Sequence, residues 1–254
     1  MSINRRDFIA ACGAFAATNS LARPVRGILG SGEEFEDEPI IDPTAADYVQ
    51  NGLIAHWDGL ENIGYGEHSN NTSTWVDLKG NYDLVNFGGY SSGFWGDAWL
   101  DNNTSNRSPS VFVAASAIPY TTCEFVVALS SGGLVCLPGT ADNRMCVCTP
   151  SYAQFFNPYT ETSEEYNGTG TMSCIYRSGG AITPYENSKP LYRGTATNSW
   201  AYSRVAGKFG LFGNDKYRTY AMHGRVYAVR LYDRALSMSE IRYNHLIDKA
   251  RFGL

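Results

Sequence analysis

The end of the chain constrains the fold most, because it predicts a two-faced strand that runs directly into a helix. The segment from His223 to Gly253 reads HGRVYAVRLYDRALSMSEIRYNHLIDKARFG. Successive side chains of a strand point to opposite faces, and here both faces are mostly apolar or aromatic. One face carries Val226, Ala228, Arg230 and Tyr232, and the other carries Tyr227, Val229 and Leu231. The pattern predicts a strand covered on both sides, inside a sandwich.

The helix that follows has start and stop signals of its own. Ser237 and Glu240 have the spacing of a capping box, which predicts a helix beginning at about Met238, and Gly253 is placed to end it. The predicted buried stripe is Ile241, His245, Leu246 and Ala250.

The rest of the chain is a succession of short strands and turns. The first strand is predicted from Leu53 to Asp58, with Trp57 in the core. Two more strands are predicted, from Trp75 to Leu78 and from Tyr82 to Phe87, joined at residues 79–81. Further strands are predicted at 123–129, 133–137, 144–149, 171–177, 182–186 and 208–212. With no repeat, βαβ unit or phosphate-binding loop, the pattern predicts an all-β fold.

Two segments resemble a known superfamily. The closing segment, from GRVYAVRLYDRALS to DKARFG, is similar to the final strand and helix of the laminin-G-like branch of the concanavalin A-like lectin/glucanase superfamily. Asp47 to Gly66, with TWVDLKG after it, resembles the opening of such domains in secreted or surface proteins of gut-type bacteria. The resemblance implies an antiparallel jelly-roll β-sandwich with a short C-terminal helix over residues 47–254. It also implies a binding role, although a fold does not carry a function with it.

The N-terminus predicts export. Arg5 and Arg6 precede an apolar run that starts at Phe8, and a small-x-small site ends at Ala22. This resembles a twin-arginine signal peptide, residues 1–22, cleaved after Ala22 and recognised by the Tat translocase. A lipoprotein box ending at Cys12 is the alternative. After processing, nothing is expected to span a membrane, and the mature protein is expected in the periplasm, on the cell surface or secreted.

Residues 23–46 predict a disordered linker, with the acidic run EEFEDE followed by two prolines. The run superficially matches the paired acids of jelly-roll glycanases. That chemistry, however, requires two carboxyls fixed on a rigid element, whereas this run is expected to be solvated.

Three classes of function remain. They are a non-catalytic module that binds a polysaccharide or a surface protein, a structural or adhesive protein, and a glycan-cleaving enzyme. No E-x-D-x-E strand and no Ser/His/Asp spacing is present, which makes cleavage the weakest of the three. The resemblance to laminin-G-like domains, which are used mainly for binding, implies a non-catalytic binding module. A net charge of −5 without a Lys/Arg block argues against nucleic acid as a partner.

Candidate ligand-binding residues lie in the glycine-rich stretch around Tyr90 and Trp95. Exposed rings there can stack on sugars, but they can also plug the end of the sandwich, and plugging is the favoured interpretation because each ring buries a large area. Asp58 and Glu61 are weak candidates for Ca²⁺ ligands, although no calcium-loop motif surrounds them. His56 is more typical of a structural histidine than of a catalytic base. No other cofactor is expected.

The cysteines predict one cross-strand register. A hairpin centred on Ala141 places Cys136 opposite Cys146. Five cysteines remain after removal of the leader, an odd number, and a chain that folds before export meets a reducing compartment. Buried thiols that act as small hydrophobes are therefore expected. The C-x-C spacing does not suit zinc.

Overall fold

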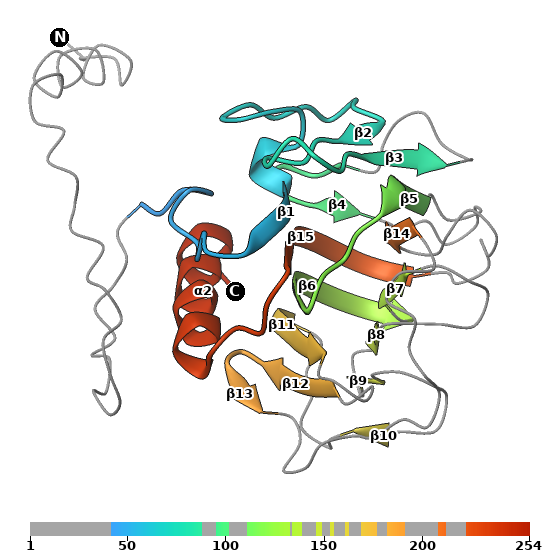
Figure 1. Cartoon of the computed structure of the whole chain (residues 1–254). Coiled ribbons are helices and arrows are strands. Elements are labelled where there is room, and N and C mark those ends of the chain that lie inside the picture. The colour runs from blue at the N-terminus through green and yellow to red at the C-terminus, as the bar shows by residue number, and fades with distance from the viewer. Residues whose placement is uncertain are drawn as a thin grey trace, which may run out of the picture. The chain divides into compact units, whose positions relative to one another are not determined.

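The chain folds as an antiparallel β-sandwich with a C-terminal helix, as expected (Figure 1). The computed structural model describes residues 42–87, 95–101, 111–132, 134–138, 146–148, 153–154, 161–162, 169–176, 182–190, 208–211 and 222–254. The leader residues Arg5, Arg6, Phe8 and Ala22, the acidic run and Tyr90 lie outside these ranges.

Two sheets contain the strands of the described residues. The first has the order β1-β15-β6-β11-β12-β13, with β4 also paired to β15, and the second has the order β10-β9-β8-β7-β14-β5-β3-β2. The first sheet consists of β1 (Leu53–Asp58), β4 (Leu100–Asp101), β6 (Thr122–Gly132), β11 (Thr169–Tyr176), β12 (Ile182–Glu186), β13 (Lys189–Pro190) and β15 (Met222–Tyr232). The second consists of β2 (Thr74–Trp75), β3 (Leu84–Phe87), β5 (Val111–Ala117), β7 (Leu134–Pro138), β8 (Cys146–Cys148), β9 (Ala153–Gln154), β10 (Glu161–Thr162) and β14 (Lys208–Leu211).

The aromatic core lies between the sheets. Trp57 of β1 is fully buried and stacks on Phe209 of β14, with ring centroids 5.4 Å apart and planes at 4°. Its indole N–H donates to the carbonyl of Tyr82. The expectation that Trp57 belongs to the core is confirmed.

The closing strand β15 lies between β1 and β6, inside the first sheet as predicted, but its two faces differ from the simple alternation. Val226 pairs with Val127 and Ala228 with Val126, so Tyr227 is one extra residue, a β-bulge. The bulge shifts Val226 to the face of Val229 and Leu231, in the core between the sheets. The predicted faces of Val226 and Tyr227 are therefore corrected, since Tyr227 packs with Ala228 and with Phe252 of the C-terminal helix.

The predicted strand from Trp75 to Leu78 is also shorter than expected, because a buried carboxylate turns the chain. Asp77 accepts backbone N–H bonds from His56, Lys79, Asn81 and Tyr82, at 2.8 to 3.1 Å. Strand β2 therefore ends at Trp75, and Gly80 takes a positive φ of 76° in the turn.

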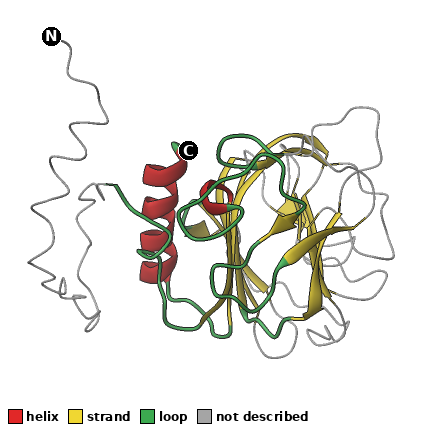
Figure 2. Cartoon of the chain, turned by 90° about the horizontal axis from the view of Figure 1, so that it is seen from above, coloured by secondary structure: helices red, strands yellow, loops and turns green. Residues whose placement is uncertain are grey.

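Helix α2 (Met238–Phe252) has the predicted caps and a different buried face. Ser237 and Glu240 form the capping box, and Gly253 ends the helix in the left-handed region with φ of 68°. The helix lies on the outer side of a sheet (Figure 2). Its buried residues are Ile241, Asn244, Ile247 and Asp248, whereas His245 and Leu246 are half-buried and Ala250 is exposed. The predicted stripe is correct only at Ile241, because the sheet offers polar partners to Asn244 and Asp248.

The predicted cysteine register is confirmed: Cys136 of β7 faces Cys146 of β8. Cys123 and Cys174 also face each other, on β6 and β11, and both are buried in the core between the sheets. Among the described residues, no helix is long and apolar enough to cross a membrane.

Candidate functional site

A buried ion network fixes helix α2 on the outer face of the first sheet. Arg230 of β15 donates to both oxygens of Asp248, with N–O distances of 2.7 Å, and through Nε to Glu124 of β6 at 3.0 Å. Asn244 donates to Glu124 at 2.8 Å, and Tyr48 donates to Asp248 at 2.8 Å. These groups are fully or almost fully buried. The network sets the position of the last helical turn, where the site begins.

Arg251 in that last turn joins the helix to the end of β1. Its guanidinium donates to both oxygens of Asp58, Nη1 to Oδ2 at 2.5 Å and Nη2 to Oδ1 at 3.2 Å. Asp58 also caps the 3-10 helix η1 (Gly59–Glu61) by accepting from the Leu60 N–H. Burial pushes the pKa of Asp58 up, but the contact with His56 and the charge of Arg251 outweigh it and hold that pKa below its usual value.

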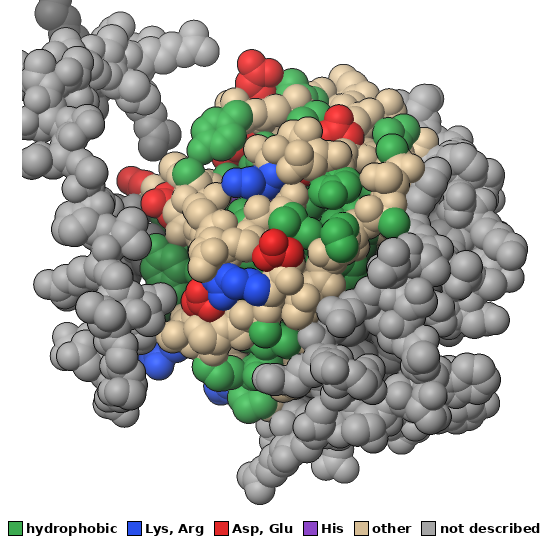
Figure 3. Space-filling model, viewed as in Figure 1, with side chains coloured by type: hydrophobic (Ala, Val, Ile, Leu, Met, Phe, Trp, Pro, Cys, Tyr) green, Lys and Arg blue, Asp and Glu red, His purple; other side chains and the backbone are tan. Residues whose placement is uncertain are grey.

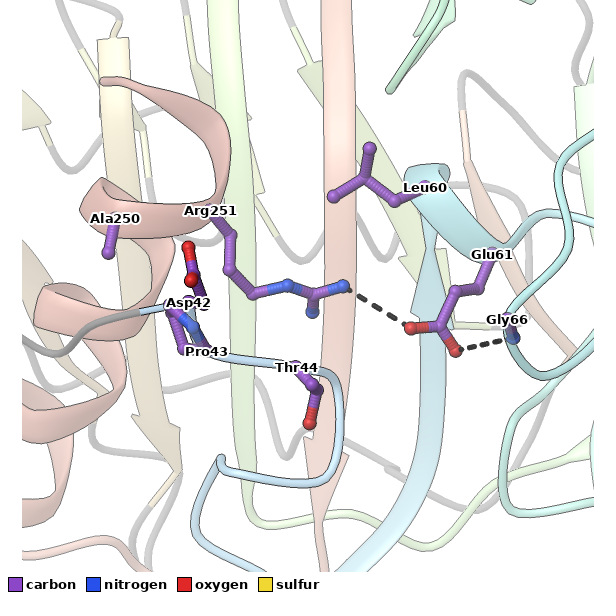
Figure 4. A pocket seen from close by; sticks show the side chains of 8 residues that line it. All are labelled: Asp42, Pro43, Thr44, Leu60, Glu61, Gly66, Ala250 and Arg251. Atoms are coloured by element: carbon purple, nitrogen blue, oxygen red, sulfur yellow. Dashed lines mark hydrogen bonds and ion pairs between the residues drawn. The ribbon is translucent and has the colours of Figure 1, made fainter. Parts of the chain in front are cut away.

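A pocket of about 430 Å³ opens beside Arg251 (Figure 4). Three segments form it: the residues before β1, the loop that starts with η1, and the end of α2. It is lined by Asp42, Pro43, Thr44, Leu60, Glu61, Gly66, Ala250 and Arg251. Carboxylate, hydroxyl and guanidinium groups therefore converge on one hollow.

Glu61 is the chemically distinctive group of the pocket. One of its oxygens accepts from Arg251 Nη2 at 3.4 Å and the other from the Gly66 N–H at 3.3 Å, both long bonds. Burial raises the pKa of the Glu61 carboxyl, and the negative charge of Asp58 raises it further. The Gly66 N–H, the charge of Arg251 and a backbone hydrogen bond from Ala45 offset only part of this effect.

The loop beside the pocket holds an exposed aromatic ring on a closed scaffold. Tyr65, which directly precedes the pocket residue Gly66, is 67% exposed. The loop is closed at its base by Asn62, whose side chain donates to the Ser69 carbonyl and accepts from the Ser69 N–H, both at 2.6 Å. His68 Nδ1 lies 2.9 Å from the Gly59 carbonyl oxygen. A ring on such a loop can stack on a ligand at little ordering cost.

Trp95 does not have the geometry of a sugar platform. It is 7% exposed, its ring makes edge contacts with Trp75 and Phe112, and its indole N–H donates to the Thr72 carbonyl. No ring face is open for stacking, so the hypothesis of a platform at Trp95 is corrected in favour of the plug. Tyr90 lies outside the described residues.

Asp58 and Glu61 do lie close together, as a calcium site would require, but their cation is Arg251. The guanidinium bonds to both carboxylates, so the interpretation as Ca²⁺ ligands is corrected. Within the described ranges, no group of three or more His, Cys, Asp or Glu side chains has the arrangement of a metal site.

Sequence reasoning missed Tyr65, Thr44 and Arg251. Tyr65 had a local signal, an aromatic residue between two glycines in a turn-rich segment. Arg251 had none, because its partners are 193 and 190 positions away in the sequence. On the face drawn in Figure 3, the Lys and Arg side chains of the described residues lie among acidic and uncharged ones.

No family model and no curated protein matches the sequence. Solved structures do match the fold. Trypanosoma rangeli sialidase in complex with the inhibitor DANA is 18% identical, with a TM-score of 0.57 over 78% of this chain and 33% of that one. Domain 4 of AbnA, a GH43 extracellular arabinanase from Geobacillus stearothermophilus in complex with arabinotriose, is 14% identical, with a TM-score of 0.52 over 76% and 98%. An HCR/D mutant is 10% identical, with a TM-score of 0.51 over 76% and 51%.

The chain spans about a third of the sialidase that it matches, and the arabinanase domain is matched over almost its whole length. At these identities the likeness concerns the fold alone. The chain is thus similar in fold to part of a sialidase and to almost the whole of one domain of an arabinanase.

Proposed function

We propose that this chain is a non-catalytic carbohydrate-binding module whose ligand stacks on Tyr65 and enters the pocket of Glu61 and Arg251. The proposal is carried by an exposed tyrosine, Tyr65, that directly precedes the pocket residue Gly66 in a loop whose pocket also has carboxylate, hydroxyl and guanidinium side chains in its lining. The C–H face of a sugar packs on an aromatic ring, and its hydroxyls pair with fixed donors and acceptors. Glu61 supplies acceptors, and Thr44 supplies a hydroxyl.

The fold neighbours support a carbohydrate as the class of ligand. Domain 4 of the arabinanase was solved with arabinotriose, and the sialidase with the inhibitor DANA. We further propose that the sandwich belongs to the laminin-G-like branch, on the resemblance of its two ends, and that it acts outside the cytoplasm after twin-arginine export. A surface protein as ligand, and a structural or adhesive role without a small ligand, are the alternatives.

Catalysis has one observation in its favour. Asp42 and Glu61 lie on two sides of the pocket (Figure 4), and glycoside hydrolysis uses two carboxyl groups, one with a raised pKa. Against it, the carboxylate that shares Arg251 with Glu61 is Asp58, which is fully buried and therefore closed to a substrate. We therefore propose binding and treat cleavage as an outcome of the test.

The test is a glycan array and polysaccharide pull-down with the purified full-length chain, alongside an assay for released reducing ends. Binding with modest affinity is expected, because an open pocket buries few contacts. Tyr65→Ala should abolish retention without changing the unfolding midpoint. Tyr243→Ala is the matched control, since Tyr243 is also an exposed tyrosine, 40% accessible, on α2 and away from the pocket lining.

The outcomes separate the alternatives. Trp95→Ala should lower stability by about 3 kcal/mol or more, as for a buried tryptophan, yet leave the folded protein able to bind. Retention that survives Tyr65→Ala would contradict the assignment of the platform. Reducing ends that disappear in Glu61→Gln would establish the enzyme, and no retention on any glycan would favour the structural role.

A further inference from the structure

We infer that this pocket selects sugars that carry a protonated amine over their neutral N-acetylated counterparts and over acidic sugars. The inference rests on the proposed function, because it assigns the ligand class of the same pocket. It depends on how the charges around the pocket balance.

The charges that line the pocket are Asp42, Glu61 and Arg251, with Asp58 directly behind them. Arg251 is the one basic side chain of the lining, and it is already engaged. It pairs with both oxygens of Asp58 and with Glu61, and its side chain is 4% exposed. Two carboxylates, Asp58 and Glu61, therefore share one guanidinium, and Asp42 adds a third negative charge to the lining, which leaves the pocket negative.

The end of helix α2 adds to this negative potential. Ala250 and Arg251 line the pocket in the last turn of a 15-residue helix that ends at Phe252. The carbonyls at the C-terminal end of a helix carry partial negative charge and stabilise cations nearby. One of these carbonyls, that of Lys249, is satisfied by the Gly253 N–H.

Glu61 has the capacity to accept a stronger bond than those that it makes. Its contacts with the Gly66 N–H and with Arg251, at 3.3 and 3.4 Å, are longer than the 2.7 to 2.9 Å or so of a charge-assisted bond to an ammonium group, and its remaining partner is a neutral backbone N–H, that of Ala45. Burial raises the pKa of the Glu61 carboxyl and the charge of Asp58 raises it further, so a cation beside Glu61 would favour its ionised form. A ligand ammonium would balance it, whereas a ligand carboxylate would add repulsion.

The experiment measures the affinity of the full-length chain for a glucosamine trisaccharide and for its N-acetylated form, by calorimetry at a pH where the amine is protonated. The two ligands share a backbone and differ in charge. We expect the amine form to bind roughly tenfold more tightly, the usual effect of one charge-assisted bond. A glucuronic-acid oligosaccharide should bind more weakly than either.

Variants locate the preference. Glu61→Gln should remove most of it, and Asp42→Asn should reduce it without strain, because asparagine tolerates the φ of 48° at this position. Asp97→Asn removes an exposed carboxylate that does not line the pocket, and it should leave the preference unchanged. If Asp97→Asn has the same effect as Asp42→Asn, the preference comes from overall charge and the inference is overturned.

The two proposals fail in different ways. Equal affinity for both trisaccharides, abolished by Tyr65→Ala, would overturn the amine preference and leave the binding module standing. Absence of binding to every glycan would overturn both.

Discussion

Arg230 and Asp248 form a bidentate ion pair, with both N–O distances 2.7 Å, between the closing strand and the helix that follows it. Asp248 also accepts from the hydroxyls of Tyr48 and Thr171, each at 2.8 Å. Four donors therefore converge on one carboxylate that is 1% exposed. This carboxylate fixes the helix, and through the helix Arg251 and the pocket.

Asp248→Ala should lower the free energy of unfolding by about 3 kcal/mol or more, because it leaves part of a buried cation and two hydroxyls without their acceptor. Denaturant midpoints measure the loss. Asp248→Asn, which keeps the shape and one acceptor, should cost less. The control is Lys249→Ala at the exposed neighbouring position, and a similar loss in both alanine variants would contradict the role of the pair.

Asp77→Asn should destabilise the sandwich by about 2 kcal/mol, because one of the two acceptor oxygens becomes a donor that faces backbone N–H groups. Thermal or chemical unfolding is the measurement. Asp83→Asn is the matched control, since exposed Asp83 accepts from the Asp77 N–H. Equal effects at the two positions would argue against the buried carboxylate as the centre of the turn.

Ser237→Ala should cost roughly 1 kcal/mol of stability, the usual contribution of an N-cap side chain. Ser237 Oγ accepts from the Glu240 N–H, and the Glu240 carboxylate accepts from the Ser237 N–H at 2.8 Å. Ser237→Asp should retain most of the stability, because an aspartate also caps. An unchanged denaturant midpoint in the alanine variant would mean that the cap contributes nothing.

His56 should make stability depend on pH on the acid side of neutrality. Burial lowers its pKa, and the nearby Asp58, 3.6 Å away, offsets part of that effect. Between the lowered pKa of His56 in the folded chain and its pKa of about 6.5 in the unfolded chain, the unfolded chain binds more protons than the folded one. The stability that depends on a neutral His56 is therefore fully present above pH about 6.5. It is lost as the pH falls from there through the pKa of the folded chain.

The pH dependence is measured as unfolding free energy in the native chain and in His56→Asn. The half-buried His245 has a lowered pKa as well and acts in the same direction, so the informative quantity is the difference between the two proteins. Parallel curves would show that His56 does not contribute the slope.

The double variant Arg5→Lys with Arg6→Lys should leave the protein in the cytoplasm, because the paired arginines are the expected export signal. Cell fractionation measures this. A variant with both arginines intact and a neutral substitution at Ser2 is the control, and normal export of the double variant would contradict the twin-arginine interpretation.

Local rules in the sequence predicted those features that depend on neighbours in the chain. The capping box at Ser237, the stop at Gly253, the first strand from Leu53 to Asp58 and the register of Cys136 with Cys146 are all confirmed. Each follows from spacing over a few residues, where backbone geometry alone decides which side chains meet. The all-β class follows in the same way from repeated strands and turns.

Tertiary structure decided the features that join distant parts of the chain. The buried face of α2 was misjudged because Asn244 and Asp248 have polar partners, Glu124 and Arg230, and helical periodicity cannot show a polar core. The bulge at Tyr227 reversed the face of Val226, since register depends on the partner strand. Trp95 had an exposed and a buried interpretation, and packing against Trp75 and Phe112 selected the buried one. The pocket arose likewise, because only the folded chain brings Arg251 to Asp58 and Glu61, and a charge is buried where a partner from elsewhere in the chain balances it.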